Sequence, residues 1–165
     1  YPLAALKHFG VHTTSHYSLS DLFVGRQSGG VGAVCGLGLL CGGIYLILRG
    51  IIRWEIAFSF LAGVFVTAFF FNVANPEQYA SPLFHLLTGN VMLGAFFLAT
   101  DDTTSPVNVI PMLIFGLGCG IMTVLIRNTG SYYDGVVYAI LLMNLTSPLL
   151  DKIRPKAIGK VVDNE

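Results

Sequence analysis

The chain has 165 residues, of which 54% are hydrophobic and only 11% are charged, and its formal net charge is zero. A soluble domain usually carries about 25% charged residues, so this chain has too little polar surface to cover a globule in water. The neutral balance also argues against nucleic acid as a partner, because binding to phosphates needs a basic patch. The composition therefore predicts an all-α integral membrane protein.

Five stretches approach the roughly 20 apolar residues that a membrane-spanning helix needs. In chain order they are residues 28–48, 54–71, 82–99, 109–126 and 135–150. Together they form a predicted transmembrane domain over residues 28–150. The mixed segment 1–27 is expected at the membrane surface, and 151–165 is expected to be a charged tail. The chain begins with Tyr1 and shows no signal sequence, so we expect it to be a segment of a longer subunit.

Glycine spacing within these spans indicates close helix packing. Pairs of small residues four apart let helix backbones approach each other in lipid. The pairs are Gly32 and Gly36, Gly38 and Gly42, and Gly116 and Gly120. The three cysteines form no Cys-x-x-Cys pair and no cluster with histidine, so no metal site is predicted.

The orientation of the spans follows from the positions of lysine and arginine near their ends, because cytoplasmic loops are enriched in both. Six of these residues fall on the side of the carboxy terminus and three on the side of the amino terminus. The first group is Arg49, Arg53, Lys152, Arg154, Lys156 and Lys160, and the second is Lys7, Arg26 and Arg127. The carboxy terminus is therefore predicted to be cytoplasmic and the amino-terminal end to lie outside.

The third predicted span carries polar residues at membrane depth, where each costs free energy and is a candidate functional group. On a continuous helix His85, Thr88, Gly89 and Met92 would share one face. Two interpretations stay open for this face. It is either a buried histidine bonded to a neighbouring helix, or a contact of His85 and Thr88 with a cofactor or substrate.

The fifth predicted span ends in a polar stripe. Asn144, Ser147 and Asp151 are spaced by three and four residues and so lie on one side of a helix. One interpretation is a helix–helix hydrogen bond plus a terminal acid that pairs with Lys152 or Arg154. The other is an entry path for a cation, because hard cations prefer oxygen ligands of this kind.

The connection between the fourth and fifth spans contains Arg127, Tyr132, Tyr133 and Asp134. Ordinary membrane architecture explains each of them: an arginine that reaches the interface, tyrosines of the aromatic belt, and an acid at a helix start. The alternative is that these residues surround a cofactor at the outer face.

Two segments resemble a known family. HLLTGNVMLGAFFLATDDTTSP, residues 85–106, and VLIRNTGSYYDGVVYAILLMNLTSPLLD, residues 124–151, resemble the RnfD membrane proteins of the Rnf complex. They are similar, more distantly, to the NqrB proteins of the sodium-pumping NADH:quinone reductase. The opening YPLAALK resembles the segment just after that family's flavin-attachment motif. One departure is Asp102, where relatives usually have proline.

The resemblance implies the carboxy-terminal half of a ten-helix subunit in a pump of the prokaryotic inner membrane. Such a pump moves electrons between ferredoxin and NAD and transports Na+ or H+. Its expected partners are membrane lipid and the other Rnf proteins, RnfA, RnfB, RnfC, RnfE and RnfG.

The resemblance also implies FMN joined through a phosphoester to a threonine in a Ser-Gly/Ala-Thr motif at or just before Tyr1. This chain contains no such motif, so no covalent site is named, and a second flavin such as riboflavin is left open. Residues 1–27 would follow the attachment region at the outer face. Arg127, Tyr132, Tyr133 and Asp134 would lie near the flavin, with His85 and Thr88, and Arg127 would favour its anionic form by charge.

Three functions are compatible with the sequence. The first is a flavin-carrying subunit of a redox-driven ion pump. The second is a non-redox small-solute channel or transporter subunit, because short, glycine-interrupted helices with polar residues at depth also suit transport. The third is a structural anchor for partner subunits.

Overall fold

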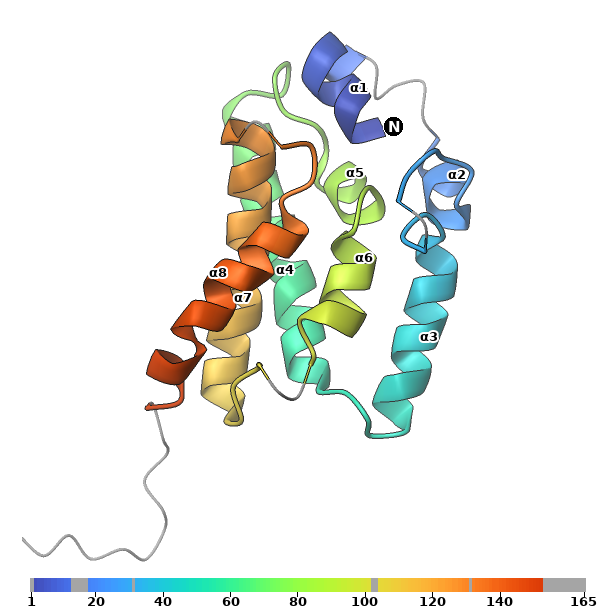
Figure 1. The fold of residues 1–165 in the computed structure, drawn as a ribbon. Coiled ribbons are helices and arrows are strands. Elements are labelled where there is room, and N and C mark those ends of the chain that lie inside the picture. Colours follow the sequence, from blue (N-terminus) through green and yellow to red (C-terminus); the bar gives the residue numbers. More distant parts are fainter. Residues whose placement is uncertain (1, 13–17, 31, 102–103, 131, 153–165) are drawn as a thin grey trace, which may run out of the picture.

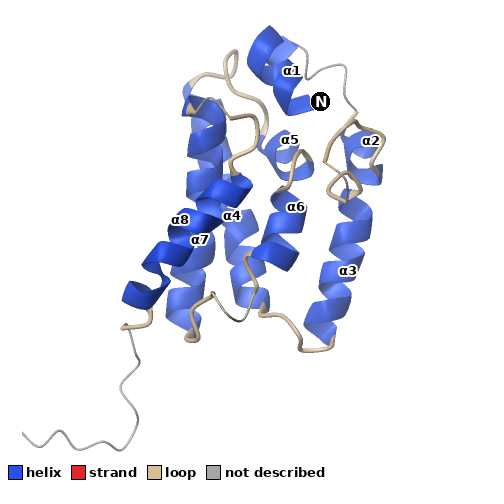
Figure 2. Ribbon diagram, in the orientation of Figure 1, coloured by secondary structure: helices blue, strands red, loops and turns tan. Residues whose placement is uncertain are grey.

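The computed structural model describes residues 2–12, 18–30, 32–101, 104–130 and 132–152. Every regular element within these residues is a helix (Figure 2). Two of them, α4 (Trp54–Ala74) and α7 (Val109–Thr129), are long and apolar enough to cross a membrane. The remaining elements are α1 (Pro2–Phe9), α2 (Leu19–Val24), α3 (Gly36–Leu48), α5 (Pro82–Leu87), α6 (Val91–Leu93), the π-helix η2 (Gly94–Leu98) and α8 (Val136–Leu150). This architecture is consistent with an all-α membrane protein.

Helices α4 and α7 pack against each other through glycines, as their spacing predicts. A Cβ atom on Gly120 would lie 2.5 Å from the carbonyl oxygen of Phe60 and 2.6 Å from the backbone nitrogen of Val64. A Cβ atom on Gly63 would lie 2.7 Å from the carbonyl oxygen of Leu117. The two backbones are therefore in direct contact. The core on either side of this contact contains Ile56, Phe60, Val64, Phe115 and Cys119.

The outer surfaces of α4, α7 and α8 are apolar. Large hydrophobic side chains are exposed along all three helices, among them Phe65, Phe69, Leu113, Leu141 and Leu145. An exposed apolar surface of this extent is typical of a protein that faces lipid or partner helices.

The first predicted span is helical only in its second part. Helix α3 begins at Gly36, and the residues described before it in the range 28–48 are not helical, with Gly32 at a φ of +85°. The thiol of Cys35 accepts a hydrogen bond from the backbone N–H of Gly38 at 3.4 Å and so marks the helix start. Gly36, Gly42 and Gly43 approach other elements, whereas Gly38 meets only Cys35 of its own helix start. A Cβ atom would lie 3.5 Å from the carbonyl oxygen of Phe23 at Gly36, 3.5 Å from the ring of Phe97 at Gly42, and against the ring of Phe96 at Gly43.

The third predicted span, 82–99, is not one helix. It consists of α5, a turn, α6 and η2, and Gly89 in the turn has a φ of +70°. The expectation that His85, Thr88, Gly89 and Met92 share a helical face is therefore wrong. Mean hydropathy cannot reveal such a break, because the residues on both sides of it remain apolar.

The connections gather at two ends of the helix assembly (Figure 1). One end holds α1, α5 and the connection between α7 and α8, and the other holds the α3–α4 connection, the chain between η2 and α7, and the end of α8. Of the basic residues in the described part of the chain, Lys7 in α1 and Arg127 in the last turn of α7 lie at the first end, and Arg49 and Arg53 between α3 and α4 lie at the second. Residues from distant parts of the sequence can therefore form a site at either end.

Candidate functional site

Helix α5 is short because local sequence sets both of its ends. Ser81 Oγ accepts a hydrogen bond from the backbone N–H of Phe84 at 3.3 Å, and Pro82 occupies the first position, where its missing N–H costs nothing. Thr88 Oγ1 donates to the carbonyl of Phe84 at 2.5 Å. Gly89 follows in the left-handed region that favours glycine. The chain therefore turns away before the second helical turn is complete.

Arg127, in the last turn of α7, reaches across to this turn. Its Nη1 donates to the carbonyl of His85 at 2.8 Å, and its Nη2 donates to the carbonyl of Thr88 at 3.0 Å. Only 1% of the arginine side chain is exposed. Of the two interpretations of Arg127, the one in which it reaches outward to the membrane interface is therefore wrong, because Nη1 and Nη2 bind protein carbonyls inside the molecule.

Asp134 completes the arrangement from the connection before α8. Its Oδ1 lies 2.9 Å from Arg127 Nη2, and its Oδ2 accepts from the backbone N–H of Asn90 at 2.7 Å. Oδ1 also accepts from the N–H of Val136 at 3.4 Å, which is the predicted role at a helix start. One carboxylate thus joins the break, α7 and α8.

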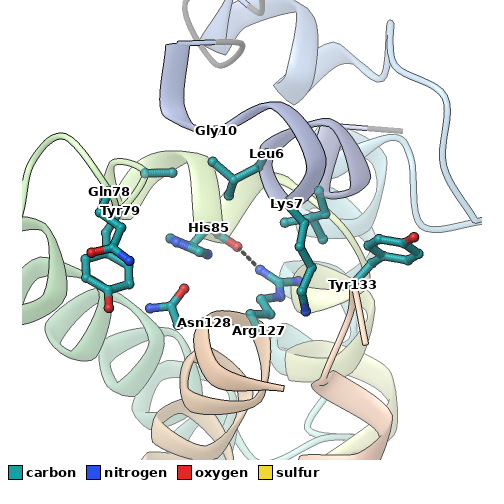
Figure 3. Close-up of a pocket in the computed structure, with 11 residues that line it drawn as sticks. Leu6, Lys7, Gly10, Gln78, Tyr79, His85, Arg127, Asn128 and Tyr133 are labelled. Atoms are coloured by element: carbon teal, nitrogen blue, oxygen red, sulfur yellow. Dashed lines mark hydrogen bonds between the residues drawn. The ribbon is translucent and has the colours of Figure 1, made fainter. Parts of the chain in front are cut away.

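A pocket of about 250 Å³ opens beside Arg127 (Figure 3). Figure 3 shows Gln78 and Tyr79 on one side, Lys7 and Tyr133 on the other, and His85 and Asn128 between them. The lining residues are Leu3, Leu6, Lys7, Gly10, Gln78, Tyr79, Ala80, His85, Arg127, Asn128 and Tyr133. None of them carries a carboxylate, so the pocket suits a neutral or anionic group rich in hydrogen-bond acceptors.

Three nitrogen atoms of the lining residues are buried and have no hydrogen-bond partner: His85 Nδ1, Arg127 Nε and Asn128 Nδ2. The arginine and asparagine nitrogens are donors, and the histidine nitrogen can donate or accept. Buried polar atoms are nearly always paired in folded proteins, by protein groups or by ordered water, so three unpaired ones in residues that line one pocket make this pocket the candidate site.

Helix α1 covers one side of the pocket. Leu3 is buried and packs with Leu22 and Phe84. Lys7 Nζ donates to the carbonyls of Gly130 and Tyr132, the latter at 3.0 Å. His8 Nε2 lies 2.8 Å from the hydroxyl of Tyr133. The segment immediately after Tyr1 is thus fixed against the α7–α8 connection, although Tyr1 itself lies outside the described residues.

The structure brings together only part of the predicted flavin group. His85, Arg127 and Tyr133 line the pocket. Thr88 is fully buried, and Asp134 contacts Arg127 rather than the pocket.

Tyr132, also in the predicted group, is exposed and places its ring 4.7 Å from that of Tyr138. Sequence reasoning missed Asn128, Lys7 and Gln78. The polar character of Asn128, directly beside Arg127, was the available signal.

The predicted ion-path residues lie at the opposite end of α8. Asn144 Oδ1 is a buried acceptor without a partner, and Ser147 is buried. Asp151 Oδ1 accepts from the backbone N–H of Val107 at 3.3 Å. Among the described residues no ion pair joins Asp151 to Lys152. The acid therefore holds the end of α8 against the connection that precedes α7. Groups of three or more metal-ligating side chains are absent from the described part of the chain.

Comparison with known proteins places this arrangement in a family. The D component of an ion-translocating oxidoreductase complex from Stutzerimonas stutzeri is 40% identical over 146 residues, which are 88% of this chain and 41% of the relative. The D component of a Na(+)-translocating ferredoxin:NAD(+) oxidoreductase complex from Acetobacterium woodii is 40% identical over 159 residues, 95% of this chain and 47% of the relative. The corresponding protein of an ion-translocating oxidoreductase complex from Pectobacterium carotovorum is 47% identical over 124 residues, 74% of this chain and 35% of the relative.

The chain thus spans less than half the length of these relatives. The model of the NQR2, RnfD, RnfE family matches residues 1–159, nearly the whole chain. The resemblance carried by residues 85–106 and 124–151 is confirmed, and the chain belongs to the NQR2, RnfD, RnfE family.

Proposed function

We propose that this chain is part of a flavin-carrying membrane subunit of a redox-driven Na+ or H+ pump that transfers electrons between ferredoxin and NAD. The names of the relatives support membership in an ion-translocating oxidoreductase complex. The observation that best supports a flavin is the pocket beneath α1. The residues that line it include three with unpaired buried nitrogens, and the pocket lies close to the expected attachment point. Its proposed setting is the prokaryotic inner membrane, with RnfA, RnfB, RnfC, RnfE and RnfG as partners.

The residues present fit a flavin. An isoalloxazine ring is flat, apolar on its faces, and carries carbonyl oxygens and ring nitrogens along one edge. Arg127 Nε and Asn128 Nδ2 would donate to such acceptors, and His85 Nδ1 would donate or accept. Leu3 and Leu6 would shield the ring from water. A bound flavin supplies one- and two-electron transfer, while the protein supplies position and electrostatics.

The attachment is tested on the assembled complex that contains the full-length subunit. After denaturing electrophoresis, the subunit should give a yellow fluorescent band, and peptide mass spectrometry should find the mass of FMN on a threonine at or just before residue 1. An active complex whose subunit carries no flavin would reject the proposal and favour a non-redox channel, transporter or anchor.

The pocket is tested separately with substitutions of two asparagines, one in the last turn of α7 and one just before its first residue. Asn128→Leu removes an unpaired buried donor from the pocket, and Asn108→Leu is the control at the other end of the same helix. Asn128→Leu should shift the flavin absorption and fluorescence of the native complex while covalent flavin content stays normal. Identical spectra for both variants would place the ring elsewhere.

We propose a cation path at the opposite end, through Asp151, Ser147 and Asn144. The unpaired buried oxygen of Asn144 and the inward position of Ser147 support it, because both offer oxygen ligands above the acid. In the assembled complex, Asp151→Ala should weaken the apparent affinity for the coupling ion without loss of flavin. Asp21→Ala, a half-exposed acid in α2, is the control. Wild-type ion dependence in Asp151→Ala would refute the path.

The end that holds the pocket is proposed to lie outside and the end that holds Asp151 in the cytoplasm, from the six-to-three division of lysine and arginine. A membrane-impermeant thiol reagent added to intact cells should label Glu77→Cys and not Lys152→Cys, measured against cysteine-free protein. The reverse pattern would invert the topology.

A further inference from the structure

We propose that Arg127 and Asp134 are a positioning pair that joins the two halves of the broken span and holds His85 on the wall of the pocket. A helix end leaves carbonyls without partners, and inside a membrane protein each unpaired backbone group is costly because no water is present to pair with it. Arg127 satisfies the carbonyls of His85 and Thr88 by donating to both. Gln27 Nε2 donates to the carbonyl of Leu87 at 3.2 Å.

The start of the second half is paired in the same way. The backbone N–H of Asn90, which precedes α6, donates to Asp134 Oδ2 at 2.7 Å. A cation therefore lies at the carboxy-terminal end of α5 and an anion at the amino-terminal end of α6. This is the arrangement that helix dipoles favour. The ion pair replaces the hydrogen bonds that a continuous helix would have made.

Gly89 links the turn of the broken span directly to Arg127 and Asp134. A Cβ atom at this position would lie 2.6 Å from Arg127 Nη2 and 2.8 Å from Asp134 Oδ2. Both charged groups thus pack directly against the backbone of the turn, where a φ of +70° already favours glycine. A side chain here would displace the pair as well as strain the turn.

The pair affects the pocket through His85. Arg127 Nη1 holds the backbone of His85, which lines the pocket, and Arg127 lines the pocket as well. Asp134, 2.9 Å away, offsets the positive charge. The contribution of Arg127 to the pocket is therefore geometric: it fixes the position of His85 and adds little net charge.

The test uses the assembled complex with the full-length subunit. Arg127→Lys keeps the charge and loses the planar fork that binds two carbonyls at once. Positioning predicts that peptides containing Asn90 exchange their amide hydrogens about tenfold faster than in the wild type, because the break opens locally. It also predicts a changed flavin spectrum. Arg26→Lys is the matched control, from an exposed ion pair with Asp21 at 3.5 Å.

Wild-type exchange and wild-type spectrum in Arg127→Lys would overturn the inference, since charge alone would then suffice. If that variant does not assemble, Asp134→Asn takes its place, because an amide oxygen can still accept one of the hydrogen bonds. Faster exchange at Asn90 supports the inference and unchanged exchange overturns it. The prediction for the flavin spectrum rests on the proposed function, whereas the prediction for hydrogen exchange at Asn90 does not. Faster exchange in a complex without flavin would reject the flavin and keep the pair.

Discussion

The α4–α7 pair and the broken span α5–α6–η2 satisfy their backbones in opposite ways. Each long helix satisfies its own backbone along 21 residues, so the pair needs only matching shape, which Gly63, Gly116 and Gly120 supply. The broken span cannot satisfy its backbone at the turn, so it takes donors and acceptors from α7 and from the connection before α8. The comparison shows why Arg127 and Asp134 lie at the interruption between α5 and α6: an interrupted helix needs polar side chains to pair its backbone. The pocket lies beside the same residues.

Removal of the Arg127 side chain should lower the stability of the complex more than any other change considered. Arg127→Leu leaves Asp134 without its ion partner and two carbonyls unpaired, and breaking a buried pair costs about 3–5 kcal/mol. The purified complex should lose stability strongly in thermal unfolding. Arg26→Leu breaks a pair whose side chains are 78% and 49% exposed, for which at most about 1 kcal/mol is expected. Equal effects would mean that the break does not depend on Arg127.

A smaller effect is expected from added volume in the long pair. Gly120→Ala places a methyl group against the backbone of α4, which cannot move aside, so about 1–3 kcal/mol should be lost. Gly118→Ala is the control on the same helix. Its methyl group would meet the flexible end of Met143 at 2.5 Å, so a rotamer change can relieve the contact. Thermal unfolding should rank Gly120→Ala well below Gly118→Ala, and the reverse order would contradict shape-based packing.

The smallest effect concerns two buried threonines, one from each region. Thr88 Oγ1 donates to Phe84 O at 2.5 Å, and Thr123 Oγ1 donates to Cys119 O at 2.8 Å within α7. Both Thr→Val changes should cost a similar amount, about 1 kcal/mol, in thermal unfolding of the complex. Local hydroxyl bonds of this kind are available to both regions, so they do not explain the difference between them. A much larger loss in Thr88→Val would show that the threonine, in addition to Arg127, holds the break.

The continuous helices could be predicted from the sequence, and the break could not. Trp54 and Val109 are the first residues of α4 and α7 in both the prediction and the structure, because long apolar runs have clear starts. Local residues set both ends of α5, but its apolar flanks hid them, and the contacts that satisfy the turn join residues about 40 positions apart, such as Arg127 with His85, for which a single sequence carries no signal.

The candidate site was found in part for the same reason. Arg127 and Asp134 stood out as charged residues in an apolar chain, so both were named as candidates, but their mutual contact was not foreseen. Lys7 was missed because its role comes from the docking of α1 on a connection 123 residues away. Local chemistry identifies unusual residues, and the fold decides which of them meet.

The docking of α1 has a consequence for any group attached at or just before Tyr1. Such a group is tethered within a few residues of the pocket, because Lys7 and His8 hold the helix in place. Its effective concentration there would be in the millimolar range or above, on the order of that for other short tethers. A tethered group occupies the pocket even when its Kd is only somewhat below that concentration. The pocket residues would then be free to set how the group is oriented and how readily it accepts an electron, and a loosely binding pocket would lose nothing by dissociation.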